Sequence, residues 1–81
     1  MFIESNFLVF PEGEVQEIEH QLQFNQIVDM NGRPVSLPLP THKMIVYRVS
    51  KIQNKESRGE LSHYYHLELV RGEELFSLTA R

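Results

Sequence analysis

Apolar and polar residues alternate in the second half of the chain, with the two-residue period of strands that bury one face. The pattern is clearest in residues 61–70, whose apolar side chains share one parity: Leu61, Tyr65, Leu67 and Leu69. Residues 43–52 are rich in β-branched and aromatic side chains and predict the strand before it. Residues 75–80 alternate again and predict a last strand, with residues 53–60 as a polar loop and 71–74 as a turn. The residues of the last strand expected on the core face are Phe76, Leu78 and Ala80.

The dipeptide Asn31-Gly32 predicts a two-residue hairpin, because both central residues of a type I′ turn need positive φ. A turn closed there pairs Val28 with Val35 and places the apolar residues of both arms on one face. The prolines of residues 33–40 then fall at positions that do not bond to the hairpin partner. We therefore expect these residues to form an edge strand or to leave the sheet.

The N-terminal third carries weaker patterns. Residues 7–10 form an apolar run and predict a short buried strand that ends at Pro11. In residues 13–22, the positions of Val15, Ile18 and Leu22 have helical spacing. The same segment fits a strand with one bulge, and we favour the strand because the rest of the chain predicts strands.

These segments predict one small β domain over residues 1–81. Its fold class is all-β, or β-rich α+β, with five to six antiparallel strands in meander order. We expect the strands to form a small barrel or a bent sheet, with at most one short helix at 13–22. The chain has 81 residues and no cysteine, so disulfides cannot reinforce it. Added stability would come from packing or self-association, which makes a homodimer possible.

Charge is distributed unevenly about a net value of −3. Six acidic and no basic residues occupy positions 1–32, whereas eight basic and five acidic residues occupy positions 33–81. No block of basic residues occurs, so an acidic segment over a basic sheet is a better interpretation than a nucleic-acid surface. The longest apolar runs hold four residues, too few for a membrane span, and the N-terminus lacks the basic region of a signal peptide. We expect a cytoplasmic location.

His63 and His66 come closest to a chemical site. Residues three apart on a strand point to opposite faces, so the two rings cannot ligate one metal. A metal on His66 would need Glu68 and a third ligand from elsewhere, and the cysteines that structural zinc sites favour are lacking. We predict no metal, no cofactor and a partly buried His63. The sequence also lacks G-x-S-x-G, glycine-rich phosphate loops and H-E-x-x-H, so no catalysis by this chain alone is expected; an active site shared by two copies stays open.

The expected register of the strands 43–52 and 61–70 places Arg48 opposite Tyr64 and Val46 opposite His66. The resulting face mixes apolar, aromatic and basic groups, as contact surfaces do. Its members are Met44, Val46, Arg48, Tyr64 and His66. We predict a protein-interaction or accessory module that binds an unidentified partner, or itself, through this face or an open sheet edge. Two alternatives remain: the N-terminal segment covers this face, or the chain is a small-barrel nucleic-acid binder. The nucleic-acid surface would use Arg48, Lys51, Tyr64, His66 and Arg71.

Overall fold

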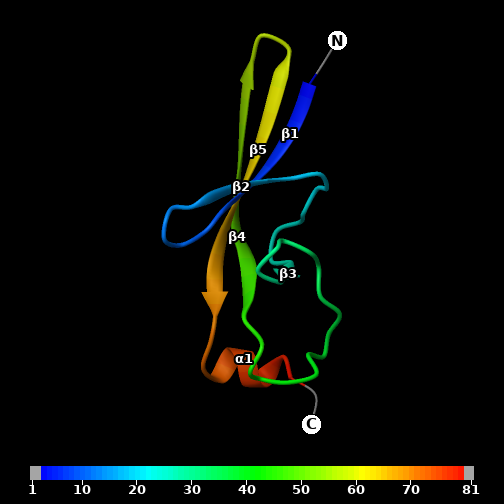
Figure 1. Ribbon diagram of the computed structural model, residues 1–81, viewed down its shortest axis with the longest axis vertical. Coiled ribbons are helices and arrows are strands. Elements are labelled where there is room, and N and C mark those ends of the chain that lie inside the picture. Colours follow the sequence, from blue (N-terminus) through cyan, green and yellow to red (C-terminus); the bar gives the residue numbers. More distant parts are fainter. Residues whose placement is uncertain (1–2, 80–81) are drawn as a thin grey trace.

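The computed structural model describes residues 3–79, which form one mixed five-stranded sheet and a short helix (Figure 1). The elements are β1 (Ile3–Val9), β2 (Val15–Ile18), β3 (Ile27–Val28), β4 (Val46–Ser57), β5 (Glu60–Val70) and α1 (Glu73–Ser77). Their order across the sheet is β2-β1-β5-β4-β3. The molecule is elongated, 49 × 22 × 16 Å, with the β4–β5 turn and α1 at opposite ends. The prediction of a β-rich fold with a bent sheet is confirmed.

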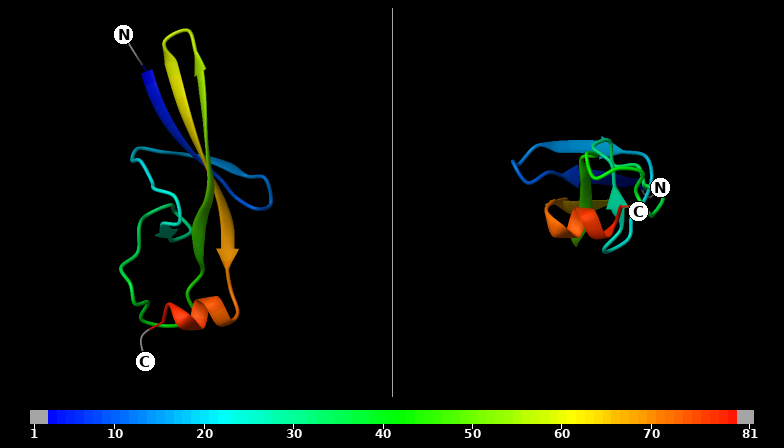
Figure 2. Two further views of the ribbon diagram at one scale, coloured as in Figure 1. Left: turned by 180° about the vertical axis from the view of Figure 1, so that it is seen from behind. Right: turned by 90° about the horizontal axis from the view of Figure 1, so that it is seen from below.

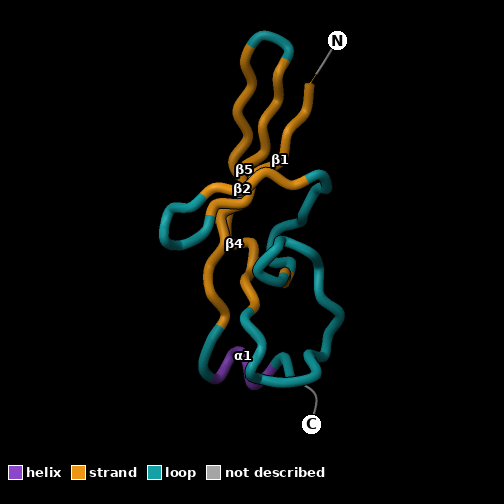
Figure 3. Tube along the Cα trace, viewed as in Figure 1, coloured by secondary structure: helices purple, strands orange, loops and turns teal. Residues whose placement is uncertain are grey.

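β4 and β5 form a long hairpin, and β1 runs beside β5 nearly to the hairpin turn (Figure 3). Its turn consists of Arg58 and Gly59, whose φ angles of 39° and 83° fit a type I′ turn. The expected loop at 53–60 is therefore wrong: β4 runs on to Ser57. Residues 53–58 are all exposed, so this part of β4 has no buried face and no alternation by which the sequence could have revealed it.

β1 lies inside the sheet, antiparallel to β2 and parallel to β5. The expected meander of antiparallel strands is wrong at this point. The apolar run at 7–10 concerns the two faces of the strand and does not reveal which strands lie at its edges. Within 13–22, the strand interpretation is confirmed for Val15–Ile18, which form β2 and pair with β1 without the predicted bulge.

The turn after β3 differs from the predicted one. Gly32 N–H donates to the Asp29 carbonyl, so Met30 and Asn31 are the central residues. The Asp29 carboxylate also accepts hydrogen bonds from the backbone N–H groups of Asn31 and Arg33, at 2.8 and 3.0 Å. This side chain moves the turn by one residue, an effect that the Asn-Gly pair did not predict.

The shifted turn also changes the pairing after it. Val28 lies opposite Pro34 instead of Val35. The chain leaves the sheet beyond this bridge, which confirms one of the two expectations for residues 33–40. Leu39 returns to the core and is fully buried.

The sheet curls into a half-barrel (Figure 2). Two separate hydrophobic cores lie against its two faces. The inner core lies on the face of Leu8 and consists of Leu8, Phe10, Ile18, Leu22, Val28, Val49, Tyr65 and Leu67. The lower core lies on the other face and consists of Ile27, Leu39, Val46 and Val70. We call these the inner and outer faces.

The end of the sheet near α1 is closed by the helix and by residues 33–45. Leu75 and Leu78 pack against the lower core. Residues three apart lie on one side of a helix, so Leu75 and Leu78 share a face of α1. Phe76, which the two-residue spacing placed on the core face, is exposed. The predicted last strand is wrong, and Ala80 lies outside the described residues. In the described part of the chain, no helix has the length and apolar character needed to cross a membrane.

Candidate interaction surface

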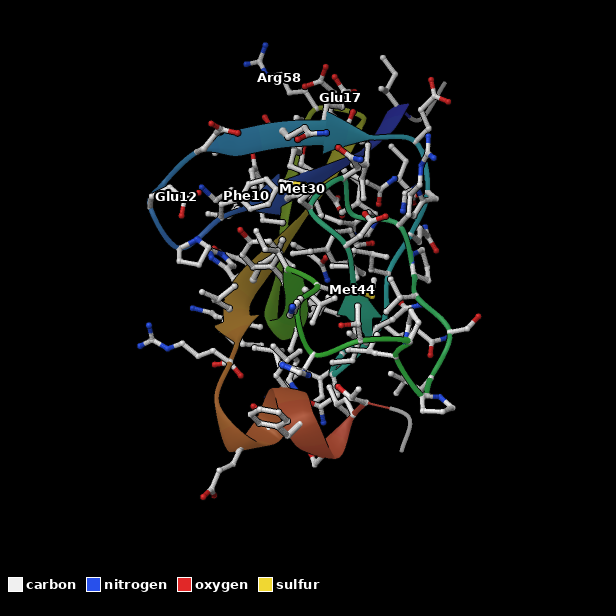
Figure 4. The ribbon with its side chains drawn as sticks, turned by 60° about the horizontal axis from the view of Figure 1, so that its bottom comes forward. Phe10, Glu12, Glu17, Met30, Met44 and Arg58 are labelled. Atoms are coloured by element: carbon white, nitrogen blue, oxygen red, sulfur yellow. The ribbon has the colours of Figure 1, made fainter. Side chains whose placement is uncertain are left out.

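The structure separates the five residues predicted to form one contact surface. Val46 is 0% exposed and belongs to the lower core, and Met44 packs against that core beside β3 (Figure 4). Arg48 forms ion pairs with Glu68, at 3.0 Å, and with Glu74 of α1. These three residues hold the lower end together, and only Tyr64 and His66 remain from the predicted set.

The separation follows from the register of the hairpin. Arg48 lies opposite Glu68 and Val46 opposite Val70, four residues along β5 from the predicted partners. A two-residue turn closes the hairpin where the sequence suggested an eight-residue loop, and the shorter turn pairs β4 with later residues of β5. The predicted Arg48–Tyr64 pair is therefore wrong.

Tyr64 and His66 lie on the outer face, half-buried, above the lower core. Residues 12–24 do not cover them, because β2 extends the sheet beside β1. β1 places Phe7 next to Tyr64, and the two rings stack with centroids 5.1 Å apart and an interplanar angle of 17°. The same register places Val9 beside His66.

Together these side chains form a largely apolar row, interrupted by Ser5 between Ile3 and Phe7, which we call the aromatic strip. By strand parity it consists of Ile3, Phe7, Val9, Val15, Tyr64 and His66. Ile3 and Val15 are each more than half exposed. Phe7 and Val9 were absent from the predicted surface, although the apolar run at 7–10 contains a signal for them: both parities are apolar, so one set must lie away from the inner core.

Charged groups border the strip on both sides. Lys51 and Lys55 of β4 share its face, and the Lys55 ammonium lies 5.3 Å from the centroid of the Tyr64 ring, a cation–π distance. Glu17 of β2, labelled in Figure 4, shares the same face at the opposite border. The strip therefore has a basic border along β4 and an acidic residue along β2.

The inner face carries a polar cluster that joins three strands. His63 Nδ1 lies 2.6 Å from Asn54 Oδ1, and His63 Nε2 lies 3.4 Å from a carboxylate oxygen of Glu4. Deeper in the sheet, the Tyr65 hydroxyl donates to Asn6 Oδ1 at 3.0 Å. These contacts connect β4, β5 and β1 side by side, so the polar groups of the inner face serve to hold the strands together.

His63 and His66 lie on opposite faces, as the alternation predicts. His63 is half-buried, also as expected, but its ring contacts side chains and not the backbone. His66 Nε2 lies 3.3 Å from Gln53 Oε1 on the outer face. Among residues 3–79, no three His, Asp or Glu side chains are grouped to hold a metal ion.

A protein family described as "Uncharacterised Treponema protein" matches residues 2–78. The chain belongs to this family. The match includes every strand of the sheet and α1. No curated protein and no solved structure matches the chain.

Proposed function

We propose that this chain is a non-catalytic protein-interaction module that binds a partner through the aromatic strip. The observation that carries the proposal is the Phe7–Tyr64 stack on the outer face. Neither core includes Phe7 or Tyr64, and both side chains remain half-buried. Contiguous aromatic surface left open in this way is typical of a binding site.

The borders of the strip suggest the chemistry of the partner. Its centre fits apolar side chains, and Lys51 and Lys55 fit carboxylates on the side of β4. The partner would therefore present an apolar patch flanked by acidic residues. We propose that this binding takes place in the cytoplasm.

A pair of matched variants tests the use of the strip. Val15 on the strip and Leu37 on the loop after β3 are 53% and 52% exposed. We expect Val15→Asp and Tyr64→Ala to abolish capture of the proteins that the immobilised chain retains from a lysate of its source organism. Leu37→Asp is expected to retain the same proteins. Equal capture by all three variants, or no protein retained by the original chain, would contradict the proposal.

One observation favours nucleic acid as a second candidate. The Tyr64 ring lies beside Phe7 and under Lys55, an arrangement that also suits stacking of an unpaired base next to a phosphate. The predicted basic set is otherwise dispersed: Arg48 is engaged in ion pairs, and Arg71 follows the far end of β5. Binding of random single-stranded DNA and RNA, measured at two salt concentrations, tests this candidate. No binding at low salt would end it.

A further inference from the structure

β4 has an unpaired edge along more than half of its length. One edge of β4 pairs with β5 from end to end. On the other edge, β3 pairs only with two residues near the start of β4, and the last backbone bonds join Val49 to Asn25 and Gln26. Within residues 3–79, no strand pairs with this edge from Lys51 to Ser57.

The hairpin turn determines which backbone groups face this open edge. Ser57 and Glu60 are the innermost pair of a two-residue turn, and such a pair exchanges both of its hydrogen bonds. Backbone groups of an antiparallel strand point alternately to its two neighbours. The residues whose N–H and C=O groups face the open edge are therefore Ile52, Asn54 and Glu56. The other end of β4 agrees, because Val49 bonds away from β5 and the register shifts by one residue before Lys51.

The open edge is complementary to itself. A two-fold axis perpendicular to the sheet pairs two such edges antiparallel and places one residue opposite its own copy. The middle of the open segment is Asn54. Pairing centred there satisfies the outward groups of Ile52, Asn54 and Glu56 in both copies. At each end of this pairing, the hairpin turn after Ser57 of one copy lies opposite the segment of the other copy in which Val49 bonds to Gln26.

Charge selects the same register. Centred on Asn54, the pairing places Lys55 opposite Gln53, and Lys51 opposite Ser57. A pairing centred on Gln53 would place Lys51 opposite Lys55. A pairing centred on Lys55 would place Lys55 opposite its own copy. Like charges directly opposite one another destabilise a sheet, so of these three registers the central one is free of such a pair.

We propose that this edge of β4 pairs with the same edge of a second copy, antiparallel about Asn54, to form a homodimer with one continuous sheet. Lysines on an edge strand ordinarily prevent indiscriminate pairing. Here Lys51 and Lys55 permit the register centred on Asn54 and destabilise the two registers shifted from it by one residue. The contact is a single strand pair and therefore smaller than a standard interface, so we expect a dissociation constant weaker than micromolar.

Hydrogen exchange at single residues tests the pairing directly. At protein concentrations well below the expected constant, the amides of Ile52, Asn54 and Glu56 have no partner and exchange quickly. At concentrations well above it, the same three amides become protected. The amides of Gln53 and Lys55 bond to β5 and stay protected at both concentrations, which provides an internal control. If the exchange rates of the amides of Ile52, Asn54 and Glu56 do not change with protein concentration, the proposal is overturned.

Two variants of one residue test the register. In the proposed pairing, Gln53→Glu places a carboxylate opposite Lys55 twice in each dimer, whereas Gln53→Lys places a second ammonium there. Gln53→Glu keeps an oxygen that can face His66 Nε2, whereas Gln53→Lys does not; His66 belongs to β5 of the same copy, so this difference lies away from the open edge. We expect sedimentation to show a dimer about three- to ten-fold tighter with Gln53→Glu and correspondingly weaker with Gln53→Lys. Monomers at every concentration, or a shift in the same direction for both variants, would overturn the proposal.

The dimer and the aromatic strip can be tested separately. Val15 lies on β2, at the opposite border of the sheet from the open edge. Val15→Asp is therefore expected to leave the dissociation constant of the dimer unchanged. If Val15→Asp abolishes the dimer, the copies associate through the outer face. That result would contradict the pairing of β4 edges and would leave the aromatic strip as a binding surface.

Discussion

Gly32 lies in the turn after β3. Its replacement by alanine is expected to cost an unusually large part of the stability of the fold. Its φ of 79° is in the region that residues with a Cβ rarely adopt, and a Cβ built there would lie 2.5 Å from Cδ1 of Leu8. Leu8 is 0% exposed and belongs to the inner core, so its side chain would have to shift against the core residues around it. The backbone conformation costs about 1–2 kcal/mol, and overpacking of a core adds about 1–3 kcal/mol. We expect Gly32→Ala to lower the free energy of unfolding by about 2–5 kcal/mol.

Gly13 provides the matched control. It also has a positive φ, of 98°, but a Cβ there meets nothing within 4 Å. Gly13→Ala should therefore carry the backbone cost alone. Urea unfolding followed by circular dichroism measures both variants, and the difference between them isolates the contact with Leu8. A chain of this length has a total stability of about 4–12 kcal/mol, so Gly32→Ala is expected to lose a large part of it.

A second substitution at Leu8 tests the cause. Leu8→Val removes the δ carbons that the new Cβ would meet, so Gly32→Ala should cost less in that background than in the original chain. Two results would refute the packing argument and leave only the backbone cost. One is an equal loss of unfolding free energy for Gly32→Ala and Gly13→Ala; the other is a loss for Gly32→Ala that does not change when Leu8 is Val.

Three further substitutions probe the polar contacts that hold the sheet and its lower end. Tyr65→Phe removes the hydroxyl that donates to buried Asn6 and should cost about 1–3 kcal/mol in urea unfolding; a loss below this range would mean that water satisfies the amide. Arg48→Gln removes both ion pairs of a guanidinium whose side chain is 20% exposed. We expect a loss of about 1 kcal/mol and NMR shifts in α1, neither of which Lys51→Gln should produce. Asp29→Ala frees two backbone N–H groups of the turn and should cost about 1 kcal/mol; unchanged stability would show that the turn does not depend on the carboxylate.

Alternation was sufficient to predict the elements that have one buried face. Residues 61–70 correspond closely to β5, because Tyr65 and Leu67 face the inner core. The exposed end of β4 escaped prediction, since its side chains face solvent on both sides and obey no period. The signal for its turn, Arg58-Gly59, is also far weaker than Asn-Gly. α1 escaped for another reason: in so short a segment, the apolar spacing fits a strand and one turn of helix equally well.

The candidate surface depended on contacts that no local pattern contains. The alternation of β5 identified Tyr64 and His66 as the outward pair, and they remain in the strip. Phe7 joins them only because β1 runs parallel to β5, a neighbour that is distant in sequence. Met44 and Val46 were lost because α1 and residues 33–45 close over the lower part of the same face.

The two proposals together determine how a dimer would present its binding surface. A two-fold axis perpendicular to the sheet leaves the outer face of each copy on the same side. The two strips, each centred on Phe7 and Tyr64, would then point in one direction at opposite ends of the joined sheet. Two strips held in this way can bind a partner that repeats its own site, with an apparent affinity well above that of one strip. Gln53→Lys should remove this gain for an immobilised, densely packed partner while sparing the affinity of a single strip. Equal losses on dense and sparse surfaces would show that the strips act independently.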